Sequence, residues 1–144
     1  MAVRRETVVA VGGFDERLGA GAAGCSEDSE LWYRLLARGG ECRYKPDAVV
    51  FHHHRRDTAD LEIQAYQYMR GHVAALWIEF GSHGHWGNVR RALGELPTYF
   101  LRQALAELPG SGPVKRRVLT ASYAGYLAGL TKVPLALSGR SGGR

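Results

Sequence analysis

The stretch GCSEDSELWYRLLARGG, residues 24–40, places two adjacent carboxylates where a glycine-rich loop turns into an apolar helix. Ser26 is predicted to cap this helix, and Glu27 and Asp28 fall in its first turn, where carboxylates interact favourably with the helix dipole. A carboxylate that a helix fixes and a flexible loop covers is well placed to act as a general base. The alternative is that both acids only cap the helix and complement its dipole.

The rest of this helix has the spacing of an amphipathic segment. Leu31 and Leu35 share one face, and Glu30 can form an ion pair with Arg34, which follows it by one turn. Two consecutive glycines after residue 38 predict the end of the helix.

Both flanks of the helix carry recognisable patterns. The segment TVVAV, residues 7–11, predicts either the end of a helix or a short strand, and a loop containing five glycines follows it. After the helix, ECRYKPDAVVFH, residues 41–52, predicts a strand, a turn and a second apolar strand. That strand leads into three histidines, of which His52 and His54 share a side. A histidine at a strand end can ligate a divalent metal or bind phosphate, and it can also be simply solvated.

From Asp60 onward the periodicity becomes that of helices. Residues 61–81 carry apolar side chains at helical spacing, and residues 88–108 do the same but contain Pro97, which should kink or divide the helix. A further helix is predicted to start at Pro113. Residues 118–137 have the length of a membrane span, but their lysine, proline and hydroxyls predict contact with a bilayer surface rather than a crossing.

Composition limits the classes of function. The chain has 144 residues, of which 45% are hydrophobic and 23% charged, as in one globular domain or part of one. A net charge of +5 suits anionic partners such as nucleotides or phospholipid head groups. Nucleic acid is not an expected partner, because the aromatic residues do not alternate with the basic ones. Two cysteines without metal-ligand spacing indicate a reducing compartment, and no secretion signal is recognised.

Four motifs follow one another in about the first 55 residues: MAVRR, VGGFDE, the acidic pair in EDSELWYRL, and a strand pattern that ends in A-V-V-x-H. In this order they resemble the second half of the catalytic domain of family 2 glycosyltransferases, which are inverting enzymes of the nucleotide-sugar-binding GT-A fold. The resemblance implies an α/β fold in which residues 1–56 form part of a GT-A domain. The remainder resembles the helical C-terminal extensions of bacterial members. Residues 57–137 are then a helical extension and a candidate for membrane association, and residues 138–144 are a disordered tail.

The resemblance also implies a reaction. A sugar would pass from a nucleotide-sugar donor to a hydroxyl of a glycan or lipid-linked acceptor with inversion, and Asp28, with Glu27 beside it, would be the catalytic base. A Mg²⁺ or Mn²⁺ ion would neutralise charge on the departing diphosphate, with His52 and His54 as its candidate ligands. The substrate-binding residues carried over are Gly12, Gly13, Phe14, Asp15, Trp32 and Arg34.

The family's nucleotide-binding half and its Asp-x-Asp motif have no counterpart in this sequence. We therefore expect a fragment, or a reading frame begun too late, that shows little or no transfer on its own. The family's usual setting is the cytoplasm, at the periphery of the inner membrane face. The alternative is an inactive truncated chain that acts as a membrane-surface or anion-binding module, in which basic helices dock on anionic lipid.

Overall fold

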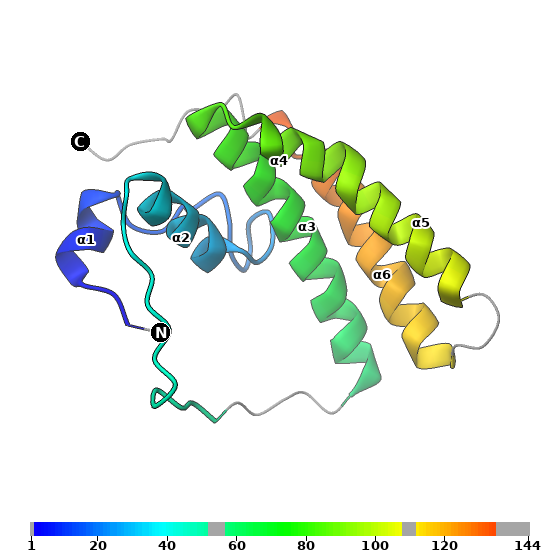
Figure 1. The fold of residues 1–144 in the computed structure, drawn as a ribbon. Coiled ribbons are helices and arrows are strands. Elements are labelled where there is room, and N and C mark those ends of the chain that lie inside the picture. Colours follow the sequence, from blue (N-terminus) through cyan, green and yellow to red (C-terminus); the bar gives the residue numbers. More distant parts are fainter. Residues whose placement is uncertain (1, 52–56, 108–111, 135–144) are drawn as a thin grey trace.

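The structure, a computed structural model, describes residues 2–51, 57–107 and 112–134. Figure 1 shows the long helix α3 in the middle, with α1 and α2 on one side of it and α5 and α6 on the other. The helical elements are α1 (Arg5–Ala10), α2 (Glu27–Ala37), α3 (Thr58–His83), α4 (Trp86–Arg90), a π-helical turn η1 (Arg91–Glu95), α5 (Leu96–Glu107) and α6 (Pro113–Leu130).

The described residues contain no β-strand, so the predicted α/β fold with part of a GT-A sheet is wrong for this chain. Residues 41–51, for which the sequence predicts strands, form an exposed irregular segment, and Phe51 is 93% exposed. A strand needs a neighbour that takes up its backbone hydrogen bonds, and the described part of the chain offers this segment none. The one β-bridge recorded, between Gly19 and Gly24, is isolated and closes a loop.

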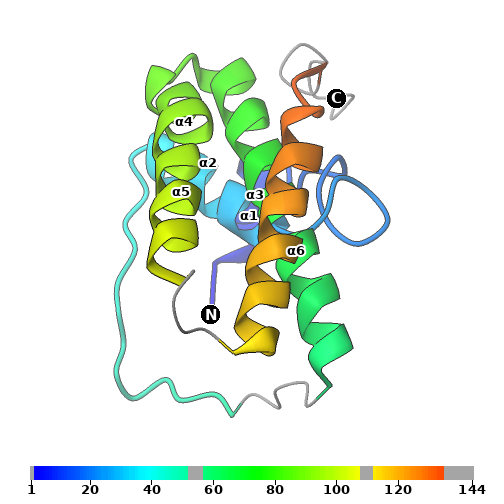
Figure 2. The same ribbon diagram turned by 90° about the vertical axis from the view of Figure 1, so that its right-hand side faces the viewer.

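The largest hydrophobic cluster joins α3 to the helices that follow it. Val73 of α3 packs with Phe100 of α5 and Tyr126 of α6. Helices α3 and α6 approach closely because Gly125 has no side chain where its backbone meets the carbonyl oxygen of Tyr66. This close approach makes α3 and α6 the central helix pair, which Figure 2 shows together with α5.

A second cluster attaches the N-terminal region to the same long helix. Leu18 and Ala23 of the glycine loop are buried against Ala74 and neighbouring residues of α3. Gly71 of α3 lies so close to the loop that a Cβ there would overlap the carbonyl oxygen of Cys25. The loop is therefore anchored on α3, and this anchoring brings the start of α2 beside α3.

The helical stretch after α3 changes its winding just before Pro97. Proline lacks an N–H and its ring crowds the preceding turn, and the wider π-helical turn η1 accommodates both effects. The helical backbone continues from α4 through η1 into α5, since Arg91 and Leu96 keep right-handed helical angles, and the predicted kink or division takes the form of this local π-helical turn. The predicted start of the last helix at Pro113 is confirmed. Among the helices that the structure describes, none combines the length and the apolar character needed to cross a bilayer.

Candidate functional site

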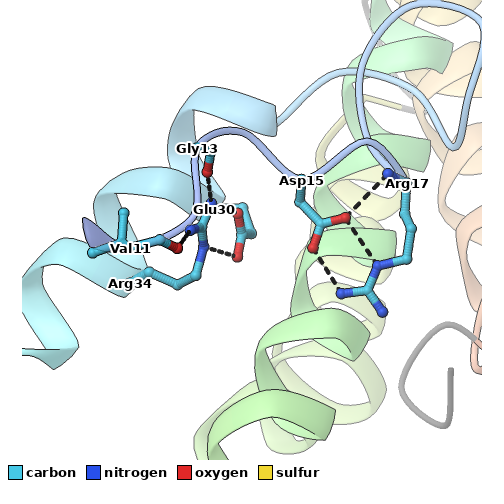
Figure 3. A network of polar contacts seen from close by, with 6 residues as sticks. All are labelled: Val11, Gly13, Asp15, Arg17, Glu30 and Arg34. Atoms are coloured by element: carbon cyan, nitrogen blue, oxygen red, sulfur yellow. Dashed lines mark hydrogen bonds and ion pairs between the residues drawn. The ribbon is translucent and has the colours of Figure 1, made fainter. Parts of the chain in front are cut away.

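Arg34, in α2, holds the glycine loop against the helix (Figure 3). Its guanidinium donates to both carboxylate oxygens of Glu30, at 2.5 and 2.7 Å, and to the carbonyl oxygens of Val11 and Gly13, at 2.6 and 2.7 Å. Arg34 and Glu30 are both buried, so water screens these charge-assisted bonds little. The predicted ion pair one turn apart is confirmed, while a role of Arg34 in substrate binding stays a prediction.

A second ion pair shapes the middle of the loop. Asp15 is buried, and its carboxylate accepts hydrogen bonds from the backbone N–H of Arg17 at 3.0 Å and from its Nε and Nη2 at 2.9 and 2.7 Å. The hydrogen bond to Asp15 holds the pKa of the Arg17 guanidinium above its ordinary value. Figure 3 shows this pair next to α3 and the Arg34 network next to α2, so two separate clamps, Arg34–Glu30 and Asp15–Arg17, hold the first half of the loop.

The start of α2 has an unusual backbone. Ser26 occupies the predicted N-cap position, but its side chain makes no capping hydrogen bond. Its φ of 89° lies in the left-handed region that residues other than glycine rarely occupy. Asp28, in the first turn, accepts hydrogen bonds at Oδ1 from the backbone N–H of Ser29 at 2.7 Å and from its hydroxyl at 3.3 Å. Backbone strain of this kind is common where a side chain must be aimed at a site.

A pocket of about 640 Å³ lies at the start of α2, between that helix, α3 and α6. This volume is within the range of about 300–1,000 Å³ that is usual for small-molecule sites. Glu27 and Asp28 form its acidic side. The lining residues are Cys25, Ser26, Glu27, Asp28, Ser29, Ala65, Tyr68, Met69, His72 and Ser122.

Glu27 brings an unsatisfied acceptor to this pocket. Its Oε2 is buried and has no hydrogen-bond partner in the described structure. The carboxylate lies against the glycine loop, since a Cβ placed on Gly19 would be 3.7 Å from its Cδ. A buried acceptor without a donor costs about 1–3 kcal/mol, so a ligand hydroxyl that reached this oxygen after a local opening would relieve an existing penalty.

His72 of α3 lines the pocket as a neutral imidazole. Its Nε2 accepts a hydrogen bond from Nε of Arg91 at 3.3 Å, which leaves the ring proton on Nδ1. Burial, and secondarily the charge of Arg91, lower the pKa of His72 below its ordinary value. At neutral pH the residue therefore adds hydrogen-bonding capacity to the pocket without adding charge.

Sequence reasoning missed the part of the pocket that the later helices supply. Tyr68 and His72 are four residues apart on α3, and that spacing was the available signal for a shared polar face. Nothing in the sequence indicates that Ser122 joins them, because it depends on how closely α6 packs on α3.

The other residues predicted for substrate binding lie away from the pocket. Gly12 and Gly13 turn the loop with φ values of 84° and 69°, Phe14 is 56% exposed, and Trp32 packs beside the buried cluster of Val11, Leu31 and Leu35. Asp15 and Arg34 are engaged in the two clamps. Of the predicted site residues within the described ranges, only Glu27 and Asp28 line the pocket.

The predicted metal ligands, His52 and His54, lie outside the described residues. Within residues 2–51, 57–107 and 112–134, no three histidine, cysteine or acidic side chains form a group that could hold a metal ion.

Comparison with known proteins finds a partial similarity. A segment of 57 residues is 40% identical to the pre-mycofactocin glycosyltransferase of Mycobacterium tuberculosis, in both strain CDC 1551 / Oshkosh and strain ATCC 25618 / H37Rv. The segment is 40% of this chain but only 11% of the length of those relatives. No protein-family profile matches the chain. No solved structure matches it either.

Proposed function

We propose that this chain contributes to glycosyl transfer, with Asp28 as the base for an acceptor hydroxyl and Glu27 as a group that binds the acceptor. The observation that carries the proposal is the acidic pair at the rim of a 640 Å³ pocket, where Glu27 Oε2 is buried without a hydrogen-bond donor. The partial similarity to a glycosyltransferase supports this class of reaction over other uses of a carboxylate pair.

In the proposed step, the acceptor oxygen attacks the anomeric carbon of a nucleotide-sugar and the bond from that carbon to the diphosphate breaks. Inversion requires the acceptor, and hence Asp28, to lie on the face opposite the departing diphosphate. Oδ1 of Asp28 already accepts two hydrogen bonds from Ser29, whereas Oδ2 has none in the described structure. Oδ2 is therefore the oxygen that we assign to take the proton.

The pocket lining favours an acceptor with several hydroxyls. Ser29 and Ser122 add hydroxyl groups, and Tyr68 adds a phenol ring whose hydroxyl and face suit a sugar ring. The Tyr68 hydroxyl already accepts a hydrogen bond at 2.8 Å from Nε2 of Gln64, which leaves its own proton for a ligand. We infer a glycan or glycosylated acceptor rather than a charged one.

The proposal also includes a metal ion, a donor site and a cellular setting, which rest on the resemblance. The resemblance to family 2 enzymes supports a Mg²⁺ or Mn²⁺ ion near His52 and His54, which would supply charge neutralisation at the diphosphate. The same resemblance supports a division into residues 1–56 and a helical extension, and action at the cytoplasmic side of a membrane.

Acceptor binding can be tested on the chain itself. Met69 lines the pocket, so a ¹³C label on its methyl group reports occupancy directly by NMR. Titration with methyl glycosides should shift the Met69 signal, and Glu27→Gln should weaken the binding because it removes the charge that accepts the ligand hydroxyl. The matched control is Asp60→Asn, an acid in the first turn of α3 that does not line the pocket.

Transfer is tested in the full-length pre-mycofactocin glycosyltransferase with its matched 57-residue segment replaced by that of this chain, since the segment is 11% of that relative. Asp28→Asn should lower kcat by about 10²–10⁴-fold with little change in glycoside binding, because the substitution keeps the size and removes the basicity. Wild-type kcat in Asp28→Asn would refute the base assignment. A Met69 signal that no glycoside moves would refute the acceptor pocket.

A further inference from the structure

An apolar groove of about 570 Å³ lies between α5 and α6, away from the acidic pocket. On α5 it is lined by Phe100, Leu101 and Ala104, and on α6 by Tyr123 and Leu127 among others. Leu101 is 61% exposed and Leu127 46%, so the groove leaves large apolar side chains in contact with water. The proposed transfer reaction uses none of these residues.

A basic residue lies one helical turn beyond the α6 wall of the groove. Thr120, Tyr123, Leu127 and Leu130 recur at intervals of three, four and three residues, and Arg116 precedes Thr120 by four residues, one turn earlier on the same face. The row from Thr120 to Leu130 is about 15 Å long at 1.5 Å per residue. Arg116 thus lies at one end of an extended apolar track.

Among the described side chains, none forms an ion pair with the charge at this end of the groove. Arg116 is exposed and has no ion pair in the described parts of the chain, whereas its neighbour Arg117 approaches Glu62 of α3 at 3.6 Å. None of the groove's lining residues is acidic, and α6 (Pro113–Leu130) contains no acidic residue at all. An extended apolar track with an unpaired cation at one end is complementary to a hydrocarbon chain that carries an anionic head.

We propose that the α5–α6 groove binds the hydrocarbon chain of a single anionic amphiphile, with its phosphate or carboxylate head at Arg116. The groove volume is within the usual range of about 300–1,000 Å³ for ligand sites, and its length suits a medium chain rather than a small molecule. The site is independent of the proposed glycosyl transfer, because it shares no lining residue with the acidic pocket.

The test uses dodecyl phosphate below its critical micelle concentration, added to the 144-residue chain and followed by isothermal titration calorimetry. Saturable one-to-one binding is expected. Dodecyltrimethylammonium, which has the same chain and the opposite charge, should bind at least fivefold more weakly, and inorganic phosphate alone should not bind measurably. Equal affinity for the two amphiphiles would overturn the role of Arg116, and no binding of dodecyl phosphate would overturn the site.

Two variants locate the ligand within the groove. Arg116→Gln should raise the Kd for dodecyl phosphate about fivefold, the size expected for one exposed ion pair, whereas Arg117→Gln should leave it unchanged although it removes the same charge from the next residue. Leu127→Gln should weaken binding of both amphiphiles, because it places an amide in the apolar track. Circular dichroism checks that each variant keeps its helix content.

Other occupants of the groove give different results. Vesicles of phosphatidylcholine with phosphatidylglycerol test a bilayer surface. Sedimentation with vesicles but no binding of monomeric dodecyl phosphate would replace the proposal with a membrane-docking face. A dimer in analytical ultracentrifugation that Leu127→Gln dissociates would assign the groove to a second copy of the chain, and this too would overturn the proposal.

Discussion

Glu79 is a buried carboxylate on α3 that lies outside the acidic pocket. Burial, and secondarily the negative charge of Glu30, raise the pKa of Glu79 to about 8, although the charge of Arg91 opposes the shift. This pKa lies above the ordinary value of 4.5. Between pH 4.5 and about pH 8, the folded chain therefore keeps a proton on Glu79 that the unfolded chain has released. The stabilisation from the neutral carboxyl is therefore complete below about pH 4.5 and is lost as the pH rises through 8.

The free energy of unfolding should accordingly fall by on the order of 2 kcal/mol between about pH 6.5 and pH 8. Glu79→Gln should remove this dependence, because the amide is neutral at every pH. Urea denaturation of both proteins across this interval measures the difference. Burial lowers the pKa of His72 and of His83, so their contributions change below the interval, when the pH falls under about 6.5. Parallel pH profiles for the two proteins would contradict the assignment to Glu79.

At the residue scale, local pairs are predictable and long-range ones are not. The spacing of Glu30 and Arg34 was enough to predict their ion pair, because helical geometry places residues four apart on the same face. That Arg34 also reaches Val11 and Gly13, more than 20 residues earlier, depends on the path of the loop. Ser26 stands at the predicted N-cap position, but the fold alone reveals that its φ is left-handed and that its side chain makes no capping hydrogen bond.

Helix α2 is coupled to the preceding loop by two arginines in contrasting surroundings. Arg34 is buried with Glu30, while Arg38 donates to the carbonyl oxygen of Ala10 at 2.7 Å in an exposed position. We expect Arg34→Leu to lower the free energy of unfolding by about 3–5 kcal/mol, because it leaves the Glu30 carboxylate buried and unpaired. Arg38→Leu is the matched control and should cost about 1 kcal/mol or less.

Urea denaturation followed by circular dichroism measures both losses. The double variant Glu30→Leu with Arg34→Leu should recover part of the stability, since it removes the stranded charge along with its partner. Equal effects of Arg34→Leu and Arg38→Leu would show that the buried network does not hold the loop.

At the element scale, helices were read correctly from the sequence because their hydrogen bonds are local. The periodicity of the apolar residues predicted helices over residues 61–81 and from residue 113 onward, and the structure has helices there. The apolar run Ala48–Phe51 has an equally clear strand pattern, but a strand depends on a partner elsewhere, and the described residues provide none. The predicted α/β fold is wrong because this strand pattern has no partner strand among the described residues.

The whole molecule consists of an N-terminal region held on the face of a helical assembly. The glycine loop and α2 meet α3 through the cluster that contains Leu18 and Ile78, and through the contact of Cys25 with Gly71. The segment after α2 is exposed throughout residues 39–51, and it includes Arg43, which forms only a solvent-exposed ion pair with Glu41. A protease should therefore cut the exposed segment that connects the two regions before the packed regions come apart.

Limited trypsin digestion should therefore cleave after Arg43 early, because the backbone around it is accessible and contributes little to the core. The two products should still elute together in gel filtration, since the buried contacts between Leu18 and α3 survive the cut, and they should part only in denaturant. Leu18→Asp gives the sharpest comparison, because a carboxylate in this interface should release the N-terminal fragment once the chain is cut. If the fragment also leaves the cut wild-type chain in native buffer, the loop anchors α2 through the chain connection rather than through packing on α3, and the acidic pocket would then depend on an intact segment 39–51.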